Sequence, residues 1–247
     1  ILRVKPSSSM EVGLQSAHHP MDNSSTKTPI KKPFVLKCPA PWILKGEGII
    51  LLFKFSKDWV KNSHHISDDL KERFRGGFGY VMMVDYQDSP VGPYRELLII
   101  PGKFRKNKKH VITRIVVDSE VSTINGRANW GIPKETFPIE WVKEKGKDKI
   151  TIRMGERTVF DAEVTFGGIS FPVSTSLLPF SLCQKRNNVK YYTEPSGSGW
   201  GKLAKLQKLD LDPEFFPDFR SVKPLLAVKI NPLEMEFPEP YFKDELV

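Results

Sequence analysis

Most apolar residues of this chain fall in short runs bounded by glycine, proline, asparagine or aspartate. Short runs that are rich in valine, isoleucine, leucine and aromatic residues predict β-strands. The predicted strands are residues 48–55, 79–84, 94–100, 110–117, 148–154, 158–166, 190–193, 202–209, 225–230 and 233–237. The chain is therefore predicted to be mainly β.

One convincing helix is predicted over residues 119–130, where apolar residues recur at helical spacing. Asp118 or Ser119 can cap its first turn by accepting a backbone N–H. Gly131 and Pro133 end it, because a proline disfavours helical backbone in the residue before it. The helix therefore runs directly into the segment that carries Lys134.

The remaining helical signal is weak and lies in residues 56–73, which predict one or two short surface helices. Many strands with few helices, and no alternation of strand and helix, predict an antiparallel β-barrel or sandwich. Residues 1–32 are rich in Ser, Pro, His and Lys and predict a disordered tail. Residues 33–247 are then expected to form a single β-barrel domain.

Composition narrows the class of protein. Thirty-eight Lys and Arg against 29 Asp and Glu give a net charge of +9, but the excess is scattered except at residues 103–110. No nucleic-acid-binding motif accompanies it, so we expect no nucleic-acid partner. No apolar run approaches the ~20 residues that span a bilayer, so no integral membrane segment is expected. Cys38 and Cys183 are predicted to be reduced, and a soluble, cytoplasmic protein is expected.

Candidate chemistry centres on Lys134, which follows Pro133 on a constrained stretch of backbone. A free lysine, with a pKa near 10.4, is neutral in only about one molecule per few thousand at pH 7, so amine chemistry needs a special environment. Judged by frequency alone, Lys134 would be a solvated loop lysine. His and Cys spacings match no metal site, so no metal and no cofactor is expected.

Three segments resemble the acetoacetate decarboxylase superfamily: Gly92–Glu96, the stretch from Val117 to Arg127, and Gly131–Lys134. The resemblance extends over roughly residues 33–237. It implies an antiparallel β-barrel or cone that encloses a buried pocket. It also implies that a lysine in the pocket forms a Schiff base with a keto acid.

Carried over residue by residue, the resemblance places the Schiff-base lysine at Lys134 and a pocket glutamate at Glu96. Tyr94, Arg127 and Trp130 are candidates for contacting substrate, and so is Met82. Arg127 could instead brace the end of the helix, and the apolar candidates could be ordinary core residues. The resemblance assigns no residue to clamp the carboxylate of the substrate.

Glu135 departs from the family pattern, because the decarboxylase proper has a second lysine at this position. An anionic Glu135 inside the pocket would favour the charged ammonium of Lys134 and oppose attack on a carbonyl. Glu135 could face away, since neighbours on an extended segment point to opposite sides. Alternatively it could act in the pocket as a general acid or base, which suits aldol or dehydration chemistry.

A second resemblance keeps a different function open. Residues 87–97 are also similar to the plant neoxanthin-deficient family, which does not retain the lysine, and this resemblance implies that a barrel of the broader group can bind an apolar molecule without Schiff-base chemistry. The leading hypothesis is an enzyme: an acetoacetate decarboxylase-like carbon–carbon lyase acting on a small or medium keto acid. The alternatives are a non-catalytic barrel that binds an apolar small molecule, and an interaction protein that uses its basic face. A homo-oligomer is left open.

Overall fold

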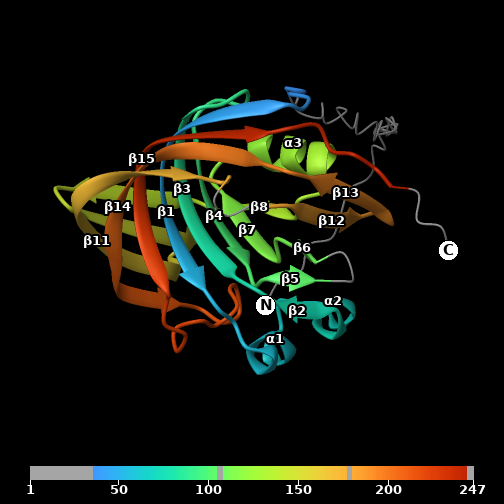
Figure 1. Cartoon of the computed structure of the whole chain (residues 1–247), viewed down its shortest axis with the longest axis horizontal. Coiled ribbons are helices and arrows are strands. Elements are labelled where there is room, and N and C mark those ends of the chain that lie inside the picture. Colours follow the sequence, from blue (N-terminus) through green and yellow to red (C-terminus); the bar gives the residue numbers. More distant parts are fainter. Residues whose placement is uncertain (1–35, 105–107, 177–179, 244–247) are drawn as a thin grey trace, which may run out of the picture. The chain divides into compact units, whose positions relative to one another are not determined.

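The chain divides into two units, Ile1–Phe34 and Val35–Val247, and a computed structural model describes residues 36–104, 108–176 and 180–243 of the second (Figure 1). The predicted tail of residues 1–32 lies outside the described residues. Within the described part, no helix is both long and apolar enough to cross a membrane.

One ten-stranded sheet dominates the described residues, and it curls strongly, with β11 and β14 wrapping around one side (Figure 1). Neighbouring strands are antiparallel except β7 and β8, which are parallel. In order across the sheet, the strands are β8 (Lys134–Thr136), β7 (Arg114–Val117), β4 (Tyr94–Ile100), β3 (Gly79–Asp88), β1 (Trp42–Phe53), β15 (Leu226–Phe237), β14 (Ser196–Leu211), β11 (Arg157–Ser174), β10 (Lys147–Met154) and β9 (Ile139–Glu144). The predicted mainly β fold with few short helices is confirmed.

A smaller five-stranded sheet and three helices complete the described residues. The strands are β13 (Val189–Thr193), β12 (Leu182–Arg186), β6 (Lys109–His110), β5 (Lys103–Phe104) and β2 (Phe74–Gly76), and the helices are α1 (Lys57–Asn62), α2 (Asp68–Glu72) and α3 (Glu120–Trp130). The prediction of one strand over residues 110–117 is wrong, because β6 and β7 pair in different sheets. The two predicted C-terminal strands are one continuous strand, β15.

The ends of α3 follow from its capping residues. Ser119 is the N-cap, and its hydroxyl accepts a hydrogen bond from the Ser122 N–H at 3.2 Å. Asp118, the alternative cap, instead accepts the backbone N–H of Arg95 at 2.6 Å. The helix stops at Gly131, whose φ of 65° is left-handed and favours glycine. The boundaries of α3 therefore agree with the prediction to within one residue.

Alternation along the central strands produces two separate cores. Val81 and Met83 point to one side, together with Leu97 and Ile99 of the next strand, into what we call the first core. Tyr80, Met82, Leu98 and Ile100 point to the other side, into the second core, which also holds Trp130 at the end of α3. The opposite faces of the same strands thus contribute to different cores, and the candidate site lies in the second.

Candidate active site

Lys134 enters the second core because of the parallel pairing of β8 with β7. Lys134 lies opposite Ile115, a second-core residue, and its side chain is 5% exposed. Glu135 lies opposite Val116, a first-core residue. Its side chain is 46% exposed and forms an ion pair with Arg114 at 2.7 Å. The two neighbours therefore leave the strand on opposite sides, and the Glu135 carboxylate is directed away from the Lys134 amine.

Three oxygen atoms surround the Lys134 amine. Its Nζ lies 2.8 Å from Glu96 Oε2, donates to Ser122 Oγ at 3.0 Å and lies 3.5 Å from the Tyr94 hydroxyl. Glu96 is also buried, because it sits between second-core valines on β3 and β7. β4, β8 and α3 thus converge on one ammonium–carboxylate pair removed from solvent.

Aromatic rings complete the surroundings of the amine. Nζ lies 4.9 Å from the centre of the Tyr94 ring and 5.9 Å from that of Trp42. Trp130 packs edge-on against Trp42, with ring centres 4.9 Å apart. The negative faces of aromatic rings attract a nearby cation. The site is therefore built to hold positive charge at the position of Nζ.

Tyr94 and its neighbour Tyr86 are neutral phenols. Burial, and secondarily the charge of Glu96, raises the pKa of both hydroxyls well above the ordinary value. The rings lie 5.0 Å apart, with Tyr94 next to Lys134. Tyr94 can therefore donate or accept a hydrogen bond at the amine, but it does not serve as an anionic base.

Small residues on α3 make room for the lysine side chain. A Cβ atom on Gly126 would lie only 2.8 Å from Lys134 Cδ and 2.9 Å from Cε. Ser122 lies four residues earlier, on the same face of the helix. Glycine at position 126 therefore lets the side chain of Lys134 cross the helix to reach Glu96.

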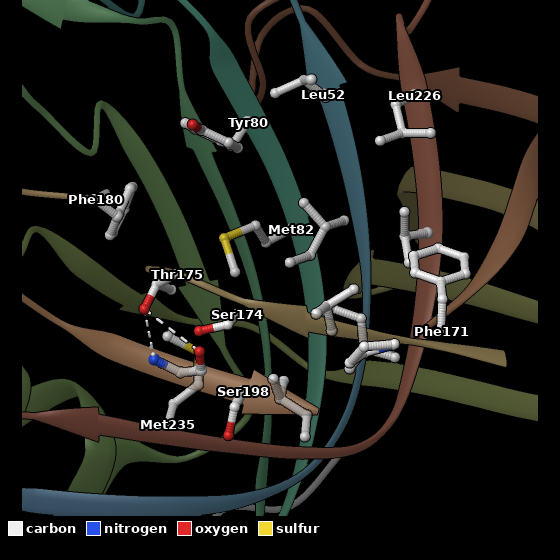
Figure 2. Close-up of a pocket in the computed structure, with 17 residues that line it drawn as sticks. Leu52, Tyr80, Met82, Phe171, Ser174, Thr175, Phe180, Ser198, Leu226 and Met235 are labelled. Carbon is white, nitrogen blue, oxygen red and sulfur yellow. Dashed lines mark hydrogen bonds between the residues drawn. The ribbon is translucent and has the colours of Figure 1, made fainter. Parts of the chain in front are cut away.

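Two cavities adjoin each other in the second core. A small one of about 20 Å³ is lined by Lys134, Glu96, Tyr94 and Trp130, among others. This is room for roughly one water molecule. A larger one of about 310 Å³ lies nearby and is lined by apolar side chains of β1, β3, β11 and β15, Met82 among them (Figure 2). Lys134 does not line the larger cavity.

The structure brings together most of the residues singled out from the sequence. Lys134, Glu96, Tyr94 and Trp130 line one small cavity, and Met82 lines the adjoining one. Arg127 and Glu135 line neither. Among the described residues that line the two cavities, Lys134 is the one cation, so no side chain there offers a separate clamp for a carboxylate.

Sequence reasoning missed Ser122 and Trp42. The spacing of Ser122 and Gly126, two small residues four apart on a helix, was a usable signal for close packing. Trp42 carried no such signal, because only the pairing of strands brings the start of β1 to Lys134. Sheet register, not local sequence, positions that ring.

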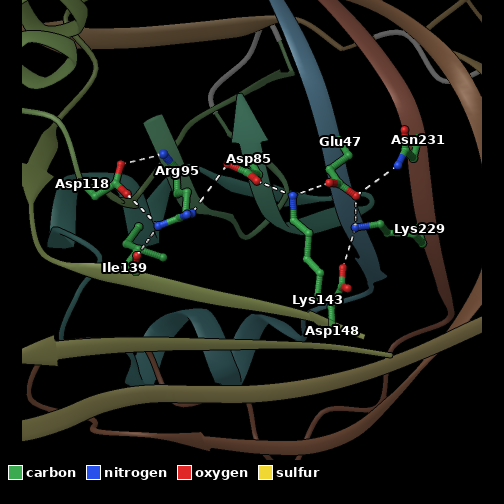
Figure 3. Close-up of polar contacts among 9 residues, drawn as sticks. All are labelled: Glu47, Asp85, Arg95, Asp118, Ile139, Lys143, Asp148, Lys229 and Asn231. Atoms are coloured by element: carbon green, nitrogen blue, oxygen red, sulfur yellow. Dashed lines mark hydrogen bonds and ion pairs between the residues drawn. The ribbon is translucent and has the colours of Figure 1, made fainter. Parts of the chain in front are cut away.

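A second buried charge cluster lies on the first-core side of the sheet (Figure 3). Lys229 Nζ lies 2.7 Å from Glu47 and 2.5 Å from Asp148. Lys143, on the edge strand β9, contacts both Glu47 and Asp85. This cluster ties β9 and β10 to the central strands and so helps to hold the curl of the sheet.

Comparisons with known proteins agree with this architecture. A model of the family described as acetoacetate decarboxylase matches residues 27–207. The acetoacetate decarboxylase of Legionella pneumophila is similar, with a TM-score of 0.63, 12% identity and coverage of 94% of this chain and 98% of that chain.

Two further solved structures resemble the chain. One is the enduracididine biosynthesis enzyme MppR complexed with pyruvate, with a TM-score of 0.60, 16% identity and coverage of 93% of this chain and 100% of that chain. The other is an acetoacetate decarboxylase-like enzyme from Sphingomonas wittichii, with a TM-score of 0.59, 14% identity and coverage of 89% of this chain and 99% of that chain. At these identities the similarity establishes the fold. Curated protein sequences give no significant match.

Proposed function

The chain belongs to the acetoacetate decarboxylase family, and on that premise we propose that it is a lyase that forms a Schiff base between Lys134 and the carbonyl group of a small or medium keto acid. The observation that carries the proposal is the buried Lys134 amine, 2.8 Å from Glu96 at the wall of a cavity. Structural relatives support this class of chemistry. MppR has been solved with pyruvate and with a condensation product of pyruvate and an aldehyde.

The first half of the proposed reaction uses Glu96 as the proton carrier. A proton passes from the Lys134 ammonium to the carboxylate across their 2.8 Å contact, which leaves a neutral amine. The amine attacks the substrate carbonyl to give a carbinolamine. Glu96 returns the proton to the carbinolamine hydroxyl, which leaves as water and creates the iminium. Ser122 and Tyr94 hold the nitrogen through this exchange.

The second half uses the iminium as an electron sink. When the bond from the α-carbon to a carboxylate breaks, carbon dioxide leaves and the electron pair forms an enamine. Protonation of the enamine carbon and addition of water release the product ketone and regenerate Lys134. The positive charge of the iminium lies where the ammonium lay, so Glu96 and the aromatic rings stabilise it.

Related aldol chemistry starts from the same iminium, which loses a proton instead of carbon dioxide from its α-carbon to give an enamine. The enamine carbon attacks an aldehyde, and loss of water from the aldol product completes a condensation. Neither route uses the Glu135 side chain, because it is paired with Arg114 and directed away from the Lys134 amine. The replacement of the family's second lysine by Glu135 therefore adds no anion beside the reacting nitrogen. Proton exchange with Glu96 across their 2.8 Å contact is then the proposed means of freeing the amine.

Borohydride trapping tests the proposal directly. The protein is incubated with acetoacetate, pyruvate or a longer 2-oxo acid, reduced with sodium borohydride, and analysed by intact mass and peptide mapping. We expect one adduct per chain, at Lys134. Glu135→Gln is the matched control and should form the same adduct in the same amount. Failure of every reactive acid to label Lys134 would contradict the proposal.

Glu96→Gln tests the proton carrier. A glutamine keeps the size of the side chain but cannot accept a proton, so formation of the adduct should slow by about a hundredfold or more. The rate is measured by quenching the reaction with borohydride at a series of times and determining the amount of adduct. The thermal unfolding midpoint of the variant is the check on folding. An unchanged rate would remove Glu96 from the mechanism.

The second candidate function is binding of an apolar molecule without chemistry. The cavity of about 310 Å³ favours it, because its lining is almost entirely apolar. Native mass spectrometry of freshly purified protein would reveal a retained ligand. An empty cavity, together with no mass shift on addition of lipids or isoprenoids, would count against this function.

A further inference from the structure

The larger cavity of the second core continues into a wider groove among the described residues. The groove, of about 700 Å³, shares Ser174, Thr175, Gly197 and Ser198 with the cavity and also Phe180. Figure 2 shows the serine and threonine side chains gathered on one side of the cavity, away from Leu52 and Leu226. The shared residues form a hydroxyl-lined mouth to the apolar interior, and the groove beyond it is also lined by charged residues, namely Lys109, Glu194, Glu234 and Glu236.

The same cavity adjoins the Lys134 cavity through paired residues on neighbouring strands. Met82 of the larger cavity lies opposite Leu98 of the small one, and Met235 lies opposite Leu44 in the same way. Residues directly opposite each other on adjacent strands bring their side chains within ~5 Å on one face. The Tyr86 hydroxyl also lies 3.9 Å from Met235 Sδ. Paired side chains, one from each lining, therefore form the wall between the two cavities, and two of these side chains are methionines.

The sizes of the two cavities indicate which part of a substrate each one can hold. About 20 Å³ beside Lys134 leaves room for only the reacting end of a substrate. About 310 Å³ lies within the lower range of small-molecule sites in proteins. Among the described residues, no charged side chain lines this larger space, so a charged or strongly hydrated group would lose its solvation there without compensation.

We infer that the substrate of the proposed Lys134 chemistry carries an apolar substituent of several carbon atoms, which occupies the larger cavity while the carbonyl carbon reaches Lys134. This inference rests on the proposed function and adds the substrate class to it. Methionine side chains at the shared wall adapt readily to the shape of a ligand. Met82 and Met235 move aside to admit the chain, and the hydroxyl-lined mouth admits it from solvent.

A series of straight-chain 2-oxo acids, from pyruvate to 2-oxodecanoate, tests the inference. The measured quantity is the concentration that gives half-maximal borohydride adduct at Lys134. It should fall by about fourfold for each buried methylene until the cavity is full. Equal concentrations across the series, or a preference for pyruvate, would overturn the inference.

Leu226→Trp tests which space the chain occupies. Leu226 lines the cavity and is 43% exposed, so a larger side chain fills the cavity at low risk to folding. We expect at least a tenfold rise in the half-maximal concentration of 2-oxodecanoate and a change of less than twofold for pyruvate. Leu225→Trp is the matched control, because Leu225 is 59% exposed and does not line the cavity. Equal effects of the two variants on 2-oxodecanoate would overturn the assignment.

Ser198→Trp at the mouth supplies a second variant, since this exposed position tolerates a large side chain. It should slow adduct formation by long acids at least tenfold, and an unchanged rate would overturn the assignment of the mouth.

Binding of uncharged ketones to Lys134→Met separates this inference from the proposed function. Decan-2-one should bind this variant at least a hundredfold more tightly than butanone, as measured by calorimetry, and Leu226→Trp should remove the difference. If this holds while no acid labels Lys134 in the wild type, the cavity assignment stands and the proposed function fails. If adducts form at Lys134 without any dependence on chain length, the proposed function stands and this inference fails.

Discussion

Lys134 and Lys229 are both buried lysines, on opposite faces of one sheet, and their side chains are each 5% exposed. Each lies near aromatic rings: Tyr94 and Trp42 for Lys134, Trp141 and Phe166 for Lys229. Lys229 is held between two carboxylates, from Glu47 and Asp148, and lines neither cavity of the second core. Lys134 contacts one carboxylate and two hydroxyl groups and lines a cavity.

Burial and an ion pair therefore do not by themselves make a lysine reactive. A nucleophile needs space for the carbonyl it attacks and a single partner that can take its proton and return it. Lys229 has neither, because two carboxylates and a packed core enclose it. Its charges instead connect β15 with β1 and β10 and stabilise the curl (Figure 3).

The largest expected effect comes from Lys134→Met, which removes the nucleophile. Turnover of any keto acid substrate should fall by at least about a thousandfold. Measurement is by steady-state kinetics at pH 7 on protein whose folding is verified by circular dichroism. The double variant Lys134→Met with Glu96→Gln avoids an unpaired buried carboxylate and should be equally inactive. Activity within tenfold of wild type would show that Lys134 is structural, like Lys229.

Lys229→Met should instead reduce stability and leave the chemistry intact. It deprives buried Asp148 of its cation, and loss of one partner from a buried pair costs about 3–5 kcal/mol in the free energy of unfolding. Urea unfolding at pH 7 measures the loss, and borohydride adduct per folded molecule should be unchanged. Lys45→Met is the matched control, because the Lys45–Glu234 pair is exposed and should contribute less than about 1 kcal/mol. Similar losses for the two variants would remove the structural role assigned to Lys229.

Gly126→Ala should impair the Lys134 site without weakening the helix. Alanine favours a helix interior over glycine by about 0.5–1 kcal/mol, but its Cβ would meet the Lys134 side chain at 2.8 Å. Displacement of the amine by a fraction of an ångström to 1 Å predicts a loss of about ten- to a hundredfold in kcat. Ile124→Ala, on the exposed side of the same helix, should change kcat less than twofold. A fully active Gly126→Ala would show that Lys134 has room to move.

The smallest effect is the acid dependence of the structural cluster. Burial raises the pKa of Glu47, but the hydrogen bonds and charges of Lys143 and Lys229 outweigh it, and the net pKa lies below its usual value. The stability contributed by this ionisation is therefore present above about pH 4.5 and is lost as the pH falls through the lowered value. The difference in unfolding free energy between wild type and Glu47→Gln should be largest near pH 7 and shrink towards pH 3. A difference that stays constant over this range would contradict the assignment.

Much of the fold was predictable from local pattern. The capped helix at α3, the strands β3, β4 and β10, and the two short helices α1 and α2 lie where periodicity places them. The errors occurred where the chain changes partners. β6 and β7 form one apolar run in the sequence but pair in different sheets, β6 with β5 and β12, and β7 with β4 and β8.

The candidate site was predictable in part. The resemblance singled out Lys134 and Glu96, and the two-residue period of a strand allowed Glu135 to face away, which the structure shows. Ser122, Trp42 and the larger cavity were not predictable. They depend on the crossing of α3 over β8 and on the pairing of β1, β3 and β15, which no local pattern contains.

By itself, the sequence determined the alternation that sends neighbouring residues to opposite faces, the ends of α3 and the small residue at position 126. Local pattern alone did not distinguish Lys134 from Lys229, since each is a lysine in or beside an apolar run, and only the family resemblance singled out Lys134. The different surroundings of the two lysines come from the tertiary structure, because Asp148 reaches Lys229 from 81 residues away, whereas Glu96, 38 positions before Lys134, meets it at the edge of a cavity. The role of each lysine depends on its ion-pair partners and on the space beside its amine, and the curl of the sheet determines both.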